Sequence, residues 1–206
     1  MITSISPKQA QARPLIVGLG GTMRANSSSE LALRMTLTAA EKAGARTMIF
    51  SGSDLDLPTY NPETPERSPK AMALISALRS ADGVIISSPA YHGSLPGYLK
   101  NALDYVEDMR ADERIYFEGR AVGCIVCAAG WQAVGPTLTT LRSIVHALRG
   151  WPTPLAVGVN SLETRFSPDG TCTSDKDAGA ISIMAGQVVR FAHMSDVGLS
   201  AIGCAA

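Results

Sequence analysis

The sequence predicts an α/β fold in which a five-stranded parallel β-sheet is covered by helices on both faces. Short apolar runs alternate along the chain with segments of helical periodicity, and glycine or proline ends several of the runs. Neighbouring parallel strands need long right-handed crossovers, which the helical segments would supply. The alternation therefore indicates three layers, with the sheet in the middle.

Five apolar segments are expected to form the strands. The first reads LIVGLG, and its glycines lead into a loop, while the third stops at Pro89. The fourth is the longest weakly polar run of the chain. The expected strands cover residues 15–20, 46–51, 83–89, 121–129 and 154–159.

Five further segments are expected to be helices. The first is ambiguous, because its leucines and Met35 alternate as in a strand, but the Ser27-x-x-Glu30 capping box and Gly44 as a stop favour helix. The clearest helix carries an apolar stripe at Leu95, Leu99, Ala102, Leu103 and Val106. The expected helices cover residues 27–43, 69–81, this stripe, 135–149 and 175–194.

The length of 206 residues favours one domain, which we assign to residues 15–206. Residues 1–14 read as a flexible polar leader without the apolar core of a signal peptide. The longest weakly polar run, residues 121–129, is far shorter than the roughly 20 residues of a membrane-spanning helix. Residues 60–69 and 161–173 are expected to be surface loops.

The charge balance gives no reason to expect a nucleic-acid or membrane partner. Eighteen basic residues balance eighteen acidic ones. The four cysteines, Cys124, Cys127, Cys172 and Cys204, do not resemble a disulfide framework, which fits a reducing cytoplasm. Cys124 and Cys127 stand three apart in an expected strand and so point to opposite faces, which favours packing over a zinc or dithiol site.

The loop after the first strand has the residues to hold an anion. It reads GGTMRANSSSE over residues 20–30 and opens a helix, whose first amides point outward unpaired. Hydroxyl groups add donors, and Arg24 adds a forked charge suited to phosphate oxygens. The loop is neither G-x-G-x-x-G nor a Walker A loop.

A plainer interpretation of the same loop stays open. Ser27 would then only cap the helix, and Arg24 would be solvated. Glu30 would also repel a nearby phosphate unless its carboxylate points away.

The loop after the third strand, residues 88–97, is the second candidate segment. In an open sheet of order 2-1-3-4-5, the first and third strands flank the point where the strand order reverses, so both loops would open onto one crevice. Backbone groups of this loop would bond the edge of a planar heterocycle, with Tyr91 or His92 beside it. Both side chains also fit a simple packing or surface role. Lys100 and Asp104 are expected to form an ion pair at the surface or at a subunit contact.

With both loops described, the sequence resembles the NADPH-dependent FMN reductase family of flavodoxin-like proteins. The phosphate motif of that family corresponds to residues 21–27, GTMRANS, and the second motif to residues 88–104, SPAYHGSLPGYLKNALD. The likeness runs over residues 15–160 and implies a flavodoxin-like sandwich of order 2-1-3-4-5. Thr22 replaces the usual serine, and His92 stands where relatives vary.

The resemblance also implies a set of FMN-binding residues. The FMN phosphate would be bound by Thr22, Arg24, Ser27 and Ser29. The ribityl chain and isoalloxazine would be lined by Pro89, Ala90, Tyr91, His92, Gly93 and Ser94, and Gly130, Trp131 and Gln132 would complete the pocket. Trp131 fits a flavin cover and a subunit contact equally well.

The expected activity is NAD(P)H-dependent reduction of FMN, with NADPH or NADH as the hydride donor. FMN supplies that chemistry, so no catalytic side chain and no metal are assigned. Three alternatives stay open: an FMN-containing quinone, azo or metal-oxyanion reductase, a flavodoxin-like electron carrier, and a scaffold without flavin. Balanced charge disfavours the carrier, since such carriers are usually acidic.

The helix after Leu95 suggests an oligomer. Together with Tyr98, Tyr105 and Met109 it carries more apolar surface than one sheet face should absorb. We therefore expect a homodimer or homotetramer.

Overall fold

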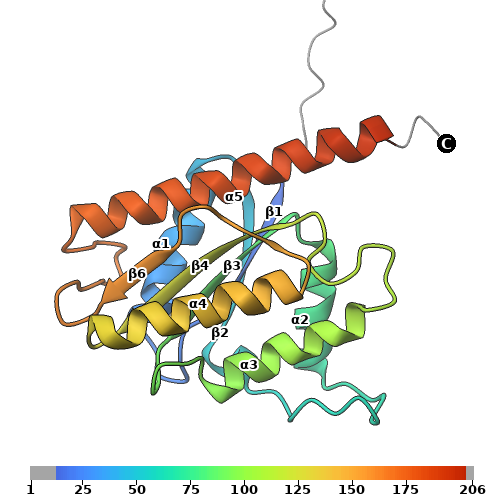
Figure 1. The fold of residues 1–206 in the computed structure, drawn as a ribbon, viewed down its shortest axis with the longest axis horizontal. Helices are drawn as coiled ribbons and strands as arrows, with labels where there is room; N and C mark the ends of the chain where they lie inside the picture. The colour runs from blue at the N-terminus through green and yellow to red at the C-terminus, as the bar shows by residue number, and fades with distance from the viewer. Residues whose placement is uncertain (1–12, 203–206) are drawn as a thin grey trace, which may run out of the picture.

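The computed structural model describes residues 13–202 and confirms the predicted parallel sheet between two layers of helices (Figure 1). Most of the expected leader, residues 1–14, and Cys204 lie outside the described residues. The division into leader and domain therefore stays a prediction.

The sheet has the expected order β2-β1-β3-β4-β5, and a further short strand, β6, also pairs with β4. All strand pairs are parallel. The strands are β1 (Leu15–Gly20), β2 (Arg46–Ser51), β3 (Gly83–Pro89), β4 (Ala121–Ala128), β5 (Trp151–Pro152) and β6 (Val157–Asn160). The central strands β3 and β4 are buried along their whole length, as their apolar composition requires.

Two helices cover one face of the sheet, and the remaining helices cover the other (Figure 1). The first pair is α1 (Ser28–Lys42) and α5 (Asp175–Ile202). The opposite layer holds α2 (Pro69–Ser80), α3 (Gly97–Asp104), α4 (Trp131–Ala147) and the short 3₁₀ helix η2 (Tyr105–Met109). A second 3₁₀ helix, η1 (Gly52–Leu55), follows β2. Among the described residues, no helix combines the length and the apolarity needed to cross a bilayer.

The first helix begins where its capping sequence predicts. Ser27 is extended and accepts a hydrogen bond at Oγ from the Glu30 amide, at 3.3 Å. The Glu30 carboxylate reaches one residue further back than a capping box requires and accepts from the Asn26 amide, at 2.9 Å. The helical interpretation of this segment is therefore correct, and the alternating leucines belong to a helix face.

The expected fifth strand, residues 154–159, is wrong in its extent. The structure has two short strands there, β5 and β6, which pair with successive parts of β4. Pro154 has no amide hydrogen and cannot donate to the sheet. The ladder therefore breaks at this position, and the Thr153 hydroxyl instead donates to the Leu155 carbonyl, at 2.7 Å.

Several helix bounds also differ from expectation, and two of them differ by four residues or more. The fourth helix begins at Trp131, four residues before the expected start, because Pro136 tolerates helical geometry and removes only one hydrogen bond near the helix start. The last helix continues to Ile202, beyond the expected end at residue 194. The early start of α4 brings its first amides to the carboxyl edge of the sheet.

The stripe after Leu95 is packed inside the chain, which removes the argument made for an oligomer. Tyr105 is 3% exposed and Met109 is fully buried. The Tyr105 hydroxyl donates to the Pro58 carbonyl, at 3.0 Å, so the 56–68 segment covers this helix face. Lys100 and Asp104 form the expected ion pair.

Candidate functional site

The loops after β1 and β3 meet at one edge of the sheet. Gly20 and Ser87 are register partners at the ends of these two strands. Arg24 from the first loop and Tyr91 from the second line the same hollow of about 290 Å³. This hollow, which we call the crevice, is lined by Thr22, Arg24, Ser27, Ser28, Ser29, Pro89, Ala90, Tyr91, Cys127, Ala128, Ala129 and Ser161.

The start of α1 offers hydrogen-bond donors to the crevice. The hydroxyls of Ser27 and Ser29 lie 3.4 Å apart, and both residues are almost fully buried. Within the described residues, the amides of Ser28 and Ser29 donate to no protein acceptor. Unpaired amides at a helix N-terminus carry partial positive charge, so this end of the crevice favours an anion.

Thr22 and Arg24 shape the loop that leads to this helix. The Thr22 hydroxyl donates to the Arg24 carbonyl and accepts from the Arg24 amide, each at 3.0 Å. This local turn holds the loop, while the Arg24 side chain is exposed and forms no ion pair in the described part of the chain. The guanidinium is thus available to an incoming anion.

The charge of Glu30 is neutralised, which answers the question raised by the sequence. Its carboxylate accepts from Arg34 Nε at 3.0 Å and from Arg34 Nη2 at 2.7 Å, besides the Asn26 amide. Glu30 therefore stabilises the start of α1 without adding a free negative charge to the crevice.

The loop after β3 forms a tight hairpin turn. Tyr91 and Ser94 exchange two backbone hydrogen bonds of 3.1 Å, and His92 and Gly93 between them have φ values of 54° and 79°. Two consecutive positive φ values are typical of a type I′ turn. The turn holds Tyr91 at the crevice, whereas Ser94 closes the turn and lines neither hollow.

A second hollow, of about 600 Å³, adjoins the crevice at Ala129. It lies between the hairpin and the start of α4 and is lined by His92, Gly93, Ala129, Gly130, Trp131, Gln132, Ala133 and Pro136. Gly130 caps α4 without any side-chain hydrogen bond, so the first amides of α4 also stand at this edge.

Trp131 is held in place although its side chain is 53% exposed. Its indole Nε1 donates to Glu163 Oε1 at 3.1 Å, and the same oxygen accepts from Asn160 Nδ2 at 2.6 Å. Asn160 ends β6, so Glu163 links the indole to the sheet. An exposed aromatic ring fixed in this way can pack against a planar ligand.

Every predicted site residue except Ser94 lines one of these two hollows. Sequence reasoning missed Ser28, Cys127, Ala128, Ala129 and Ser161, which also line the crevice. Ser161 directly follows the last strand, and the carboxyl ends of parallel strands open on the same edge, so this position was accessible to sequence reasoning.

The cysteine thiols of β4 are buried. Cys124 packs in the cluster on the α3 and α4 side and Cys127 in the cluster on the α1 and α5 side, as the strand period predicts. Burial raises the pKa of each thiol to about 12. Cys127 therefore meets the crevice as a neutral thiol.

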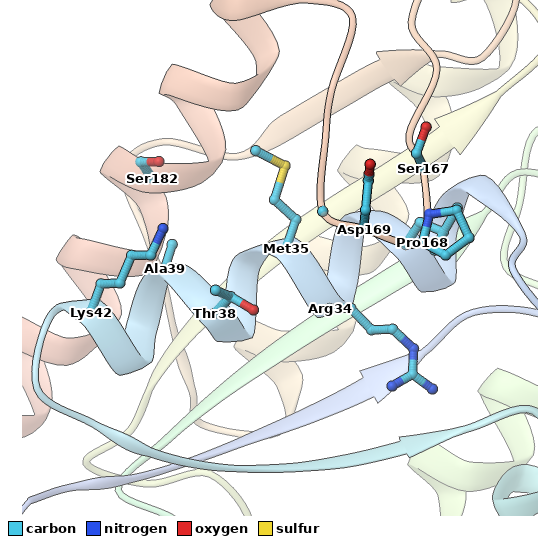
Figure 2. A pocket seen from close by; sticks show the side chains of 11 residues that line it. Arg34, Met35, Thr38, Ala39, Lys42, Ser167, Pro168, Asp169 and Ser182 are labelled. Carbon is cyan, nitrogen blue, oxygen red and sulfur yellow. The ribbon is translucent and has the colours of Figure 1, made fainter.

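A further hollow of about 300 Å³ lies away from this edge, between α1, α5 and residues 167–170 (Figure 2). None of the predicted site residues lines it. Its Arg34 side chain points away from α5 and pairs with Glu30. The two hollows beside the hairpin therefore form the candidate site.

The groups at this site suit a phosphorylated, planar ligand. Amides, hydroxyls and one guanidinium gather at the α1 end of the crevice, and backbone groups with two aromatic side chains lie at the other end. The first set matches a phosphate, and the second matches a flat heterocycle.

Comparison with known proteins points in the same direction. The family model for NADPH-dependent FMN reductases matches residues 14–163. The chain is 28% identical over 145 residues to the FMN-dependent NADPH-azoreductase of Staphylococcus haemolyticus, covering 69% of this chain and 73% of that protein. It is 32% identical over 122 residues to the FMN-dependent NADPH-azoreductase of Staphylococcus aureus, covering 59% of this chain and 57% of that protein.

A solved structure supports the fold. FerB from Paracoccus denitrificans, a flavoenzyme NAD(P)H:(acceptor) oxidoreductase, superposes with a TM-score of 0.72 at 19% identity. The superposition covers 88% of this chain and 98% of that chain. The fold is thus flavodoxin-like, as predicted.

Proposed function

Because the chain belongs to the NADPH-dependent FMN reductase family, we propose that it transfers hydride from NAD(P)H to FMN held in the crevice. Membership confirms the predicted class, an oxidoreductase with FMN and NAD(P)H as cofactors. The observation that carries the proposal for the site is that Arg24 and Tyr91, from two separate loops, line one hollow.

The FMN phosphate would bind at the start of α1. The amides of Ser28 and Ser29, the hydroxyls of Thr22, Ser27 and Ser29, and the Arg24 guanidinium are the donors. To reach a phosphate, the Thr22 hydroxyl would exchange its bond to the Arg24 carbonyl for one to a phosphate oxygen. Arg24 would add a charge-assisted hydrogen bond.

The flavin ring would extend towards the hairpin and the start of α4. Pro89, Ala90 and Tyr91 line the crevice, and His92, Gly93, Gly130, Trp131 and Gln132 line the adjoining hollow. Ser94 would act only by closing the turn. A second planar molecule, the nicotinamide, would then have to lie against the open face of the flavin ring.

Bound FMN supplies the chemistry of accepting a hydride and passing electrons on. The chain would supply positioning and electrostatics. The first amides of α4 point their partial positive charge at this edge and would stabilise negative charge that develops on the ring. Tyr91 and Trp131 would shield the ring from water, which strengthens these interactions.

The test is an anaerobic absorbance experiment on the purified protein. Added FMN should bind, and NADPH or NADH should then bleach the visible flavin band within the time of enzymatic turnover. FMN should also raise the melting temperature further with each tenfold increase in ligand concentration, with about 2.7 kcal/mol of stabilisation at a hundredfold excess over Kd. A flavin band that stays oxidised with both nucleotides would reject the proposal.

A second candidate keeps FMN as a tightly bound group and uses an azo compound or a quinone as the acceptor. The names of the staphylococcal relatives favour an azo compound. Yellow colour that persists through purification, with fast turnover of an azo dye and none of free FMN, would support this candidate.

We also propose that the protein is cytoplasmic and forms a homodimer or homotetramer. The thiols of Cys124, Cys127 and Cys172 are free, as in a reducing compartment. The support for an assembly is now a set of large exposed apolar side chains on β5 and α5, namely Trp151, Ile183 and Met194. Light scattering coupled to gel filtration would measure the assembly.

A further inference from the structure

Tyr98 joins the two loops of the site, although it lines neither hollow. It stands in the first turn of α3, and its hydroxyl donates a hydrogen bond to the carbonyl oxygen of Gly21, at the start of the loop after β1. The two residues are separated by 77 positions in the chain. Burial raises the pKa of the Tyr98 hydroxyl, so the group stays a donor across the physiological range.

The backbone amide of Gly21 is also held by a hydrogen bond. The Gly21 amide donates to the Ser87 carbonyl at 3.0 Å, so strand β3 binds one side of the residue and Tyr98 binds the other. Gly21 has a φ of 90°, a backbone conformation that favours glycine at this position.

The far end of the same loop is tied to the same strand. The fully buried Ser87 donates from Oγ to the Ser29 carbonyl, at 2.7 Å. Ser87 therefore contacts the loop at both of its ends, Gly21 and Ser29. Between these anchors lie Thr22, Arg24 and Ser27, which line the crevice.

We propose that Tyr98 and Ser87 are positioning residues that hold the loop after β1 in its phosphate-binding form. The inference rests on the proposed function. The proposal predicts that the Tyr98 hydroxyl strengthens the binding of FMN, which carries a phosphate. It should not affect the binding of riboflavin, which lacks one. Holding the loop before the ligand arrives lowers the cost of ordering it on binding.

The experiment compares the affinities of FMN and riboflavin in three proteins by flavin fluorescence titration. Tyr98→Phe keeps the ring and removes only the hydroxyl, and it should weaken FMN binding by about three- to tenfold, as expected for one hydrogen bond. Riboflavin affinity should stay within about twofold of the wild type. Tyr105→Phe is the matched control, because its buried hydroxyl also donates to a loop carbonyl, that of Pro58, away from the crevice.

Ser87→Ala gives a second, independent variant. It removes the bond to the Ser29 carbonyl and should show the same selective loss for FMN. Thermal unfolding without flavin measures the structural cost of each change separately.

The outcomes separate the two proposals. Wild-type protein that binds neither flavin would reject the proposed function itself. If the wild type prefers FMN, then an unchanged FMN affinity in both Tyr98→Phe and Ser87→Ala would overturn the positioning role. An equal loss for both flavins, or the same selective loss in Tyr105→Phe, would also overturn it.

Discussion

Gly20 and Ser87 stand so close that no side chain fits between them. A Cβ atom on Gly20 would lie 1.8 Å from the Ser87 carbonyl oxygen, and the φ of 144° at Gly20 is one that other residues rarely adopt. The close approach of β1 and β3 at this point brings the two loops of the site together.

Gly20→Ala should therefore destabilise the protein by roughly 3 kcal/mol or more, since backbone would have to move. Chemical denaturation of the flavin-free protein measures this change. Gly179→Ala is the control, because Gly179 lies in α5 with no atom within 4 Å of an added Cβ. That change should raise stability by up to about 1 kcal/mol. A Gly20→Ala protein as stable as the wild type would contradict the close packing.

Arg24→Ala should weaken FMN binding by about tenfold or more and leave the melting temperature of the flavin-free protein nearly unchanged. One charge-assisted contact to a phosphate contributes roughly 1.5 to 3 kcal/mol, and the exposed Arg24 side chain makes no ion pair among the described residues. Arg165→Ala, at another exposed arginine in a loop, is the control for general charge effects. Equal FMN affinity in the Arg24 and Arg165 variants would remove the phosphate assignment.

Trp131→Ala should weaken FMN binding by several-fold, because an aromatic contact contributes about 0.5 to 1.5 kcal/mol. Glu163→Ala should give a smaller loss, since it frees the indole without removing it. Fluorescence titration with FMN measures both. Trp151→Ala is the matched control, because Trp151 is similarly exposed but lies on β5, outside both hollows. If Trp151→Ala weakens FMN binding as much as Trp131→Ala does, Trp131 acts outside the flavin site.

The Arg67–Asp108 ion pair should make part of the stability depend on pH. Arg67 Nε lies 2.7 Å from Asp108 Oδ2, and this hydrogen bond is the largest cause that lowers the pKa of Asp108. The pKa of Asp108 in the folded chain is below its value of about 3.9 in the unfolded chain. At pH values between the two, the unfolded chain therefore binds more protons than the folded chain. The contribution of the ion pair to the free energy of unfolding is therefore complete above about pH 5. It is lost as the pH falls through the folded pKa of Asp108.

Asp108→Asn should accordingly lower the free energy of unfolding by roughly 1.5 to 3 kcal/mol near pH 7. This gap in the free energy of unfolding between the variant and the wild type should narrow in acid. Urea unfolding at a series of pH values measures this gap. Asp104→Asn breaks an exposed pair with Lys100 and should change stability by less than about 1 kcal/mol. A gap for Asp108→Asn that is constant down to pH 3 would contradict the assignment.

The sequence predicted those parts of the fold that depend on local signals. The capping serine before α1, the glycines after β1 and the alternation of apolar runs each report on neighbouring residues, and the elements that they mark are present. The split of the fifth strand was missed because a short apolar run does not reveal the effect of Pro154 on the pairing with β4.

The candidate site was predicted as a set of loops, and the contacts between the loops were not. The bonds of Tyr98 to Gly21 and of Ser87 to Ser29 join residues 77 and 58 positions apart, which no local pattern encodes. Likewise, the burial of Tyr105 depends on the 56–68 segment folding over it, so the apolar stripe was the wrong reason to expect an oligomer.

Because Arg34 neutralises the Glu30 carboxylate, the loop adds no free negative charge to the crevice, and this bears on how the loop can change during evolution. Arg24 is the one cationic side chain among those lining the crevice, so a doubly charged phosphate would be neutralised mostly by backbone amides. Every residue except proline supplies an amide hydrogen, whatever its side chain is. Exposed loop residues without an assigned contact, such as Met23 and Ala25, are then free to drift between species, as long as the path of the main chain is kept.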